Sequence, residues 1–156
     1  MATSVRIMAA VFALAAGIAI TPAMAAEATT YKAELDGKSQ VPPVNTQGSG
    51  NLTATYYPAT KRLTWKGNVS GLSGEPTAAH FHGPAEPGKN APVLIPAPGV
   101  KSGAFEGSAT LTDDQATALV AGQTYFNVHT EAFKGGEVRG QVLKTEDGMQ
   151  RADLMR

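Results

Sequence analysis

The sequence predicts an all-β domain, an antiparallel immunoglobulin-like β-sandwich or barrel with one short helix. Apolar and polar residues alternate along six or seven short segments, which is the two-residue period of strands with one buried face. Turn residues separate these segments at intervals of about eight to twelve residues, as in sandwiches and barrels. Only one segment has helical spacing, so the regular strand-helix alternation of a doubly wound fold is missing.

The amino-terminal 25 residues are predicted to be a secretory signal peptide. Arg6 is the only charged residue before Glu27, and an apolar run of fourteen residues covers 7–20. Ala23-Met24-Ala25 then provides a small-x-small cleavage site. The alternative is a membrane anchor, but the run is shorter than the roughly 20 residues that span a bilayer. We therefore expect cleavage after Ala25, a periplasmic or secreted location, and no membrane span in the mature protein.

The remaining chain is expected to contain one folded domain. Residues 26–30 are predicted to be a linker and residues 31–144 the domain. Residues 145–156 are predicted to be a flexible tail, because they have no apolar pattern that would anchor them.

Charge and composition exclude several function classes. The mature chain keeps twelve basic and thirteen acidic side chains with no basic cluster, which argues against nucleic acid or an anionic membrane surface as a partner. The absence of cysteine excludes disulfides, thiolate metal sites and cysteine nucleophiles.

The first half of the domain predicts a strand followed by a hairpin. Residues 31–35 alternate in polarity, and Pro42-Pro43 prevents a central strand from continuing. Residues 52–65 alternate on both sides of a turn at 58–61, which is the pattern of a β-hairpin. Trp65 is predicted to lie in the core, because aromatic side chains bury the most area in a small domain.

The second half predicts a loop, a helix and further strands. Residues 83–103 are rich in Pro and Gly, and only 93–95 resembles a strand within this loop. The helix is expected after Thr112, where Thr112 and Gln115 fit a capping box, and Gly122 ends it. Three more alternating segments predict strands, namely 105–111, 125–130 and 137–143, the last two joined through Lys134-Gly135-Gly136.

The three histidines of the chain lie on two of the expected strands. His80 and His82 share one face of the strand that ends at Gly83, opposite Phe81. On the strand 125–130, the face opposite the apolar residues carries Tyr125, Asn127 and His129. Two histidines at positions i and i+2 with a third from another strand is a ligand geometry used for zinc and copper.

Two hypotheses follow for these histidines. In the first, His80, His82 and His129 bind a divalent copper or zinc ion. Glu137, in the hairpin partner of the His129 strand, is then the candidate fourth ligand or orients an imidazole, and Glu131 is the other nearby carboxylate. In the second, each imidazole makes only local structural hydrogen bonds.

Three separated motifs resemble the CHRD domain, a family named for chordin and found also in exported bacterial proteins. The start of the domain matches Leu-x-Gly-x-x-Gln-x-Pro-Pro-Val at 35–44. The second motif is "AAHFHGPA" at 78–85, and the third is "YFNVHTEAFKGGEVRGQV" at 125–142. The family pattern covers His80, His82, Gly83, Pro84, Asn127, His129, Thr130, Gly135, Gly136, Glu137, Arg139 and Gly140.

The resemblance implies an all-β domain and leaves the activity open. Its animal relatives occur in proteins that bind extracellular growth factors, which implies a binding or interaction module with an extracytoplasmic protein partner. Arg139 is expected to form an ion pair with Glu137 on the same face, to be a buried anchor for a loop, or to tie down the hairpin. If no metal is bound, Asn127, Thr130 and Glu137 are expected to satisfy loop backbone groups. An enzyme is the third possibility, and it requires a bound metal with an open position for water or substrate.

Overall fold

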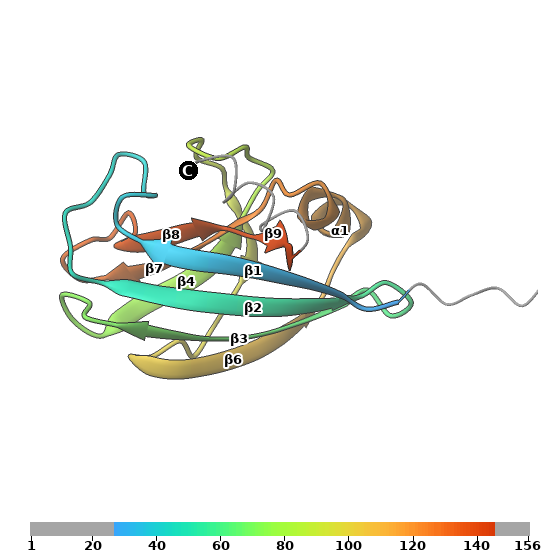
Figure 1. The fold of residues 1–156 in the computed structure, drawn as a ribbon, viewed down its shortest axis with the longest axis horizontal. Coiled ribbons are helices and arrows are strands. Elements are labelled where there is room, and N and C mark those ends of the chain that lie inside the picture. Colours follow the sequence, from blue (N-terminus) through green and yellow to red (C-terminus); the bar gives the residue numbers. More distant parts are fainter. Residues whose placement is uncertain (1–26, 146–156) are drawn as a thin grey trace, which may run out of the picture.

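The chain forms an antiparallel, nearly closed β-barrel of eight strands with one short helix (Figure 1). A computed structural model describes residues 27–145, so the predicted signal peptide and residues 146–156 of the predicted tail lie outside the described residues. The predicted all-β antiparallel fold is confirmed, in its barrel form. The elements are β1 (Thr29–Asp36), β2 (Ser49–Tyr57), β3 (Arg62–Ser70), β4 (Pro76–His82), β5 (Val93–Pro96), β6 (Gly103–Thr110), α1 (Asp113–Val120), β7 (Tyr125–Thr130), β8 (Val138–Gln141) and β9 (Leu143–Lys144).

The strands follow the order β5-β4-β7-β8-β1-β2-β3-β6, and β9 pairs with β1. The β2–β3 pair is the predicted hairpin around the turn at 58–61. β4 pairs with β7 although some forty residues separate them in the sequence, and this pairing carries all three histidines. β8 then links β7 to β1, so that the end of the domain lies beside its beginning.

The barrel interior contains the apolar residues that alternate along the strands. Trp65 is only 4% exposed, and its ring meets Phe81 edge-on with 5.1 Å between ring centroids, which confirms that Trp65 lies in the core. Phe81 in turn meets Phe126 at 4.8 Å. Burying each such side chain contributes about 1.5 to 3 kcal/mol. This aromatic contact joins β3 to β4 and β7 across the barrel.

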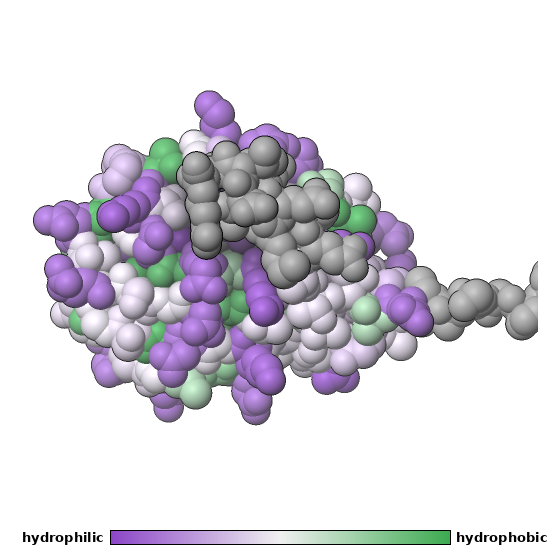
Figure 2. Space-filling view, in the orientation of Figure 1, coloured by the Kyte–Doolittle hydropathy of each residue, from purple (hydrophilic) through white to green (hydrophobic). Residues whose placement is uncertain are grey.

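The outer surface is mostly polar. On the face shown in Figure 2, hydrophobic residues are scattered among polar ones rather than gathered in one patch. Within residues 27–145, no helix is long and apolar enough to cross a membrane.

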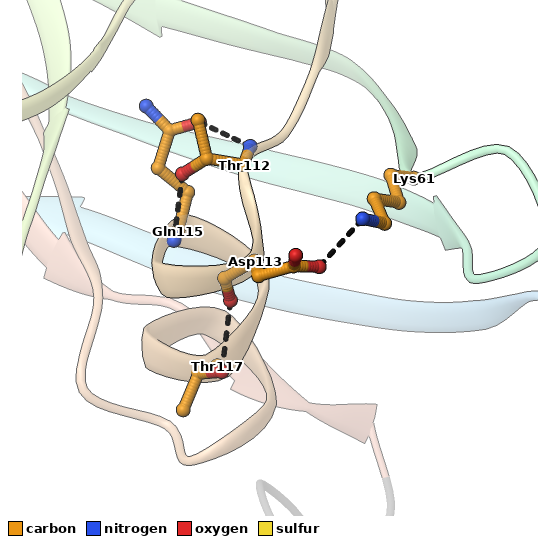
Figure 3. A network of polar contacts seen from close by, with 5 residues as sticks. All are labelled: Lys61, Thr112, Asp113, Gln115 and Thr117. Atoms are coloured by element: carbon orange, nitrogen blue, oxygen red, sulfur yellow. Dashed lines mark hydrogen bonds and ion pairs between the residues drawn. The ribbon is translucent and has the colours of Figure 1, made fainter.

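Helix α1 begins at the predicted capping box (Figure 3). The hydroxyl of Thr112 accepts a hydrogen bond from the backbone N–H of Gln115, and the Gln115 side chain accepts one from the backbone N–H of Thr112. Asp113 in the first turn forms an ion pair of 2.6 Å with Lys61, and both side chains are largely exposed. An acidic first turn and a reciprocal cap are the features that start a helix, so the first-turn residues Asp113 and Asp114 serve the helix start.

Several boundaries differ from the sequence-based expectations. β1 begins at Thr29, so the strand includes two residues that were assigned to the linker 26–30. The strand expected over 137–143 is two strands, β8 and β9, with Val142 between them. Val142 donates its N–H to Thr124 O at 2.8 Å, which takes it out of the strand pairing. Within the loop 83–103, the expected apolar strand is present as β5.

Glu137 holds together the loops at one end of the barrel. Its side chain is fully buried, and its oxygens accept hydrogen bonds from the hydroxyls of Thr46, Ser73 and Thr130, each at 2.6 Å. The N–H of Ser73 donates a further bond at 2.8 Å. These partners lie in the β1–β2 loop, the β3–β4 loop and at the end of β7. Burial alone would raise the pKa of Glu137, but these hydrogen bonds outweigh burial and lower the pKa below its usual 4.5.

Replacing Glu137 by Gln is expected to lower the free energy of unfolding by about 2 kcal/mol, because an amide leaves buried hydroxyl donors without acceptors. Since the carboxyl pKa is depressed in the folded protein, its stabilisation is present above the unfolded pKa and is lost as pH falls through the folded pKa. Thermal unfolding of both proteins from pH 7 to about pH 3 tests this. The wild type should lose more stability on acidification than Glu137→Gln; equal losses would contradict the assignment.

Candidate metal centre

The pairing of β4 with β7 brings the three histidines into one group on the outside of the barrel. In this register Ala78 pairs with His129 and His80 pairs with Asn127. His80 and His82 point outwards because Phe81 between them points into the core, where it is fully buried. The ligand nitrogen atoms of the three imidazoles all lie within 4.8 Å of one another. The faces predicted for these residues are confirmed, and the strand pairing adds their convergence.

Asn127 lies at the middle of the group. Its Oδ1 is 3.0 Å from Nε2 of His82 and 3.0 Å from Nε2 of His129. Nδ1 of His80 is 3.2 Å from the same Nε2 of His129. Three imidazole nitrogens and one amide oxygen therefore form a compact set of potential ligand atoms.

Backbone carbonyls orient two of the imidazoles. Nδ1 of His82 is 2.9 Å from Ala91 O, and Nδ1 of His129 is 2.8 Å from Lys134 O. A carbonyl oxygen only accepts, so each Nδ1 carries the proton, and in a neutral ring the lone pair is then on Nε2. Both Nε2 lone pairs face the amide oxygen of Asn127, which is itself an acceptor. No proton of a neutral His82 or His129 ring lies between Nε2 and this oxygen; Nδ1 of His80 is the ring nitrogen that can donate to Nε2 of His129, and a cation would satisfy all of these atoms.

The surroundings of His80 and His82 favour the neutral forms of these two imidazoles. Burial lowers the pKa of His80, and repulsion from His129 and His82 lowers it further. Burial also lowers the pKa of His82, although its bonds to Ala91 and Asn127 oppose this effect. Neutral imidazole is the form that ligates metals.

The separations between the ligand atoms suit a transition metal. Around an ion with bonds of about 2.0 to 2.1 Å to nitrogen, neighbouring ligand atoms lie roughly 2.9 Å apart in a square plane and roughly 3.3 Å apart in a tetrahedron. The separations of 3.0 and 3.2 Å fall in this range. The remaining separations extend to at most 4.8 Å, which is wider than either arrangement has between neighbouring ligand atoms. The group of three histidines could therefore hold a metal ion.

The loop that follows β4 covers part of this centre. Ala91 accepts the bond from His82, and its N–H donates to Tyr125 Oη at 3.2 Å. The ring of Tyr125 stacks on His82 with 4.8 Å between centroids and an angle of 1° between the planes. As a result His82 is only 8% exposed, while His80 and His129 are half-buried. Solvent therefore reaches the group from the side of His80 and His129.

The predicted carboxylate ligands do not join the group. Glu137, the candidate fourth ligand, has its oxygens engaged with Thr46, Ser73 and Thr130. Glu131 is exposed and forms an ion pair of 2.9 Å with Lys134. Glu137 is close to His129 in sequence, but its carboxylate is occupied by hydrogen bonds to hydroxyls. The sequence spacing does not reveal these hydroxyl partners.

The other predicted residues have distinct roles. Thr130 donates to Glu137, so it belongs to the barrel end rather than to the histidine group. Arg139 is a buried anchor for a loop, which confirms one of its expected roles, and it does not tie down its own hairpin: it donates to Asn90 Oδ1 at 2.9 Å and to Lys89 O at 2.6 Å, both in the β4–β5 loop. Its guanidinium lies 3.4 Å from the centroid of the Tyr125 ring.

Sequence reasoning missed the backbone acceptors and the central amide. The carbonyls of Ala91 and Lys134 carry no sequence signal, because every residue has one. Asn127 was placed on the correct face, and its position between the histidines depends on strand register. Gly136 has φ +117° and leaves room for this amide, since a Cβ there would lie 2.8 Å from Asn127 Nδ2.

Comparisons with known proteins give one match. No curated protein and no solved structure matches the chain significantly. A family model, that of the CHRD domain, matches residues 31–142, which include all the strands from β2 to β8, the helix and the three histidines. This chain therefore belongs to the CHRD-domain family.

Proposed function

We propose that this protein is an exported binding module that holds a copper or zinc ion through His80, His82 and His129. The observation that carries the proposal is the convergence of unprotonated atoms. Two Nε2 lone pairs, directed by hydrogen bonds of their own rings to backbone carbonyls, face the same amide oxygen at 3.0 Å. Such outer hydrogen bonds are typical of imidazoles that bind metals.

Asn127 is the fourth donor in this proposal, in place of Glu137. Its amide oxygen is near two of the three rings, and its side chain is 3% exposed. Three nitrogens and one neutral oxygen give a complex that keeps the full charge of the ion. This donor set is compatible with Cu(II) or Zn(II).

A structural role is the competing explanation. If the Asn127 amide is turned by half a rotation, its Nδ2 hydrogens donate to the Nε2 atoms of His82 and His129, and the group is satisfied without an ion. The two explanations differ in one measurable respect, since only the first requires bound metal. A metal-dependent enzyme would need an open ligand position, and the solvent-accessible side of His80 is where a small molecule would approach.

Export is part of the proposal and is supported by the amino-terminal sequence. The apolar run over 7–20 and the small residues before Ala25 have the pattern of a cleaved signal. An exported location is also consistent with a metal site that contains no cysteine. Interaction with another extracytoplasmic protein is compatible with the proposal whether or not the histidines hold a metal ion.

Elemental analysis of the mature protein, purified from the periplasm without a histidine tag, is expected to show nearly one copper or zinc per chain. The triple variant His80→Ala, His82→Ala, His129→Ala should contain none, because it lacks the nitrogen ligands. Circular dichroism of the variant serves as the folding control. Metal-free wild-type protein that gains no thermal stability from added copper or zinc would overturn the proposal.

Asn127→Ala is expected to weaken metal binding at least tenfold, because it removes a donor atom next to two ligands. Glu137→Gln is the matched comparison: it should lower stability but leave the metal affinity within about threefold, since its carboxylate bonds only hydroxyls and a backbone N–H. Competition with a chromophoric chelator measures both affinities. The reverse order of effects would restore Glu137 as the ligand.

A further inference from the structure

A second pocket lies between two loops on the same side of the barrel as β8. Its volume is about 340 Å³, and it is lined by Lys38 and Gln40 from the β1–β2 loop, by Pro87 and Gly88 from the β4–β5 loop, and by Arg139 from β8. The two loops are joined by a hydrogen bond of 2.9 Å from the side chain of Asn90 to Val41 O. The pocket walls are therefore connected to each other as well as to the sheet.

The guanidinium of Arg139 is a buried cation without a carboxylate partner. Arg139 is 2% exposed, and among residues 27–145 no ion pair reaches it. Asp36 is its neighbour across the β1–β8 pair, but the Oδ1 of Asp36 accepts a bond from Ser39 N–H. The two hydrogen bonds to Asn90 and Lys89 use only part of the donors that a guanidinium carries. A buried charge without an opposite charge nearby lowers the stability of the folded protein.

Gln40 adds a second group that lacks a partner. Its side chain is 5% exposed, and within the described part of the chain its Nε2 donates to no acceptor. Lys38, beside it in the pocket lining, is exposed and brings a further positive charge. This Nε2 is enclosed against Gly136 beside the Asn127 amide, so Arg139 and Lys38 are the groups that an anion in the pocket would meet.

We propose that this pocket binds a small oxyanion, a carboxylate or a phosphate group, between Lys38 and Arg139. An anion supplies the charge that Arg139 lacks and an acceptor for the donors around it, and guanidinium groups bind both kinds of oxyanion strongly. The pocket volume is near the lower end of ligand pockets, which suits a small molecule. The site is separate from the histidine centre and requires no metal.

Calorimetric titration of the mature full-length protein with sodium phosphate and with sodium acetate, at ionic strength held constant with chloride, tests the proposal. Saturable binding of one of them is expected, and the better ligand distinguishes a tetrahedral from a planar anion. Lys38→Gln should weaken binding about fivefold, the effect of losing one exposed charge contact. Lys101→Gln, which removes an exposed lysine outside this pocket, is the matched control and should leave the affinity unchanged.

Arg139→Gln should abolish binding in a protein whose folding is confirmed by circular dichroism, and Lys38→Gln remains the test if that variant does not fold. The triple histidine variant should bind the anion with the affinity of the wild type. The proposed metal site and the proposed anion site are therefore tested independently of each other. Absence of saturable binding for both anions would overturn the proposal. Equal affinities of Lys38→Gln and Lys101→Gln would also overturn it.

Discussion

The pairing of β4 with β7 is the constraint on which the rest of the candidate site depends. It places His80 opposite Asn127 and His129 opposite Ala78, so that ligand atoms from two distant segments meet. A slip of β4 by one residue in this register would turn His80 and His82 inwards and Phe81 outwards. The contact between Phe81 and Phe126 in the interior opposes such a shift. Core packing on one face of the sheet therefore determines ligand geometry on the other.

Local periodicity explains why much of the fold was predictable. The alternation around Trp65 and around Phe81 depends on burial of one strand face, and the cap at Thr112 depends on residues only three apart. Each of these signals is contained within a few neighbouring residues. The same holds for the outward faces of His80 and His82, which follow from a core residue between them.

The partners of Glu137 and of Arg139 could not be predicted in the same way, because they lie in distant segments. Glu137 is close to His129 in sequence, yet it bonds Thr46 and Ser73, which are 91 and 64 residues away. Nothing in the local sequence indicates those partners. Likewise, Arg139 is the expected buried anchor of a loop, but no local signal indicates that this loop lies 50 residues earlier. Spacing along the chain therefore predicts the partners of a polar side chain poorly, because hydroxyls, carbonyls and metals can all bind it.

Tyr125 touches both of the regions discussed above, since its ring stacks on His82 and lies under the guanidinium of Arg139. Its hydroxyl is also bonded to Ala91 in the covering loop. A displacement of this ring would change the packing of the imidazole and of the cation together. The barrel thus has, in one aromatic ring, a packing element that the histidine group shares with the guanidinium of Arg139 and with the loop that covers them.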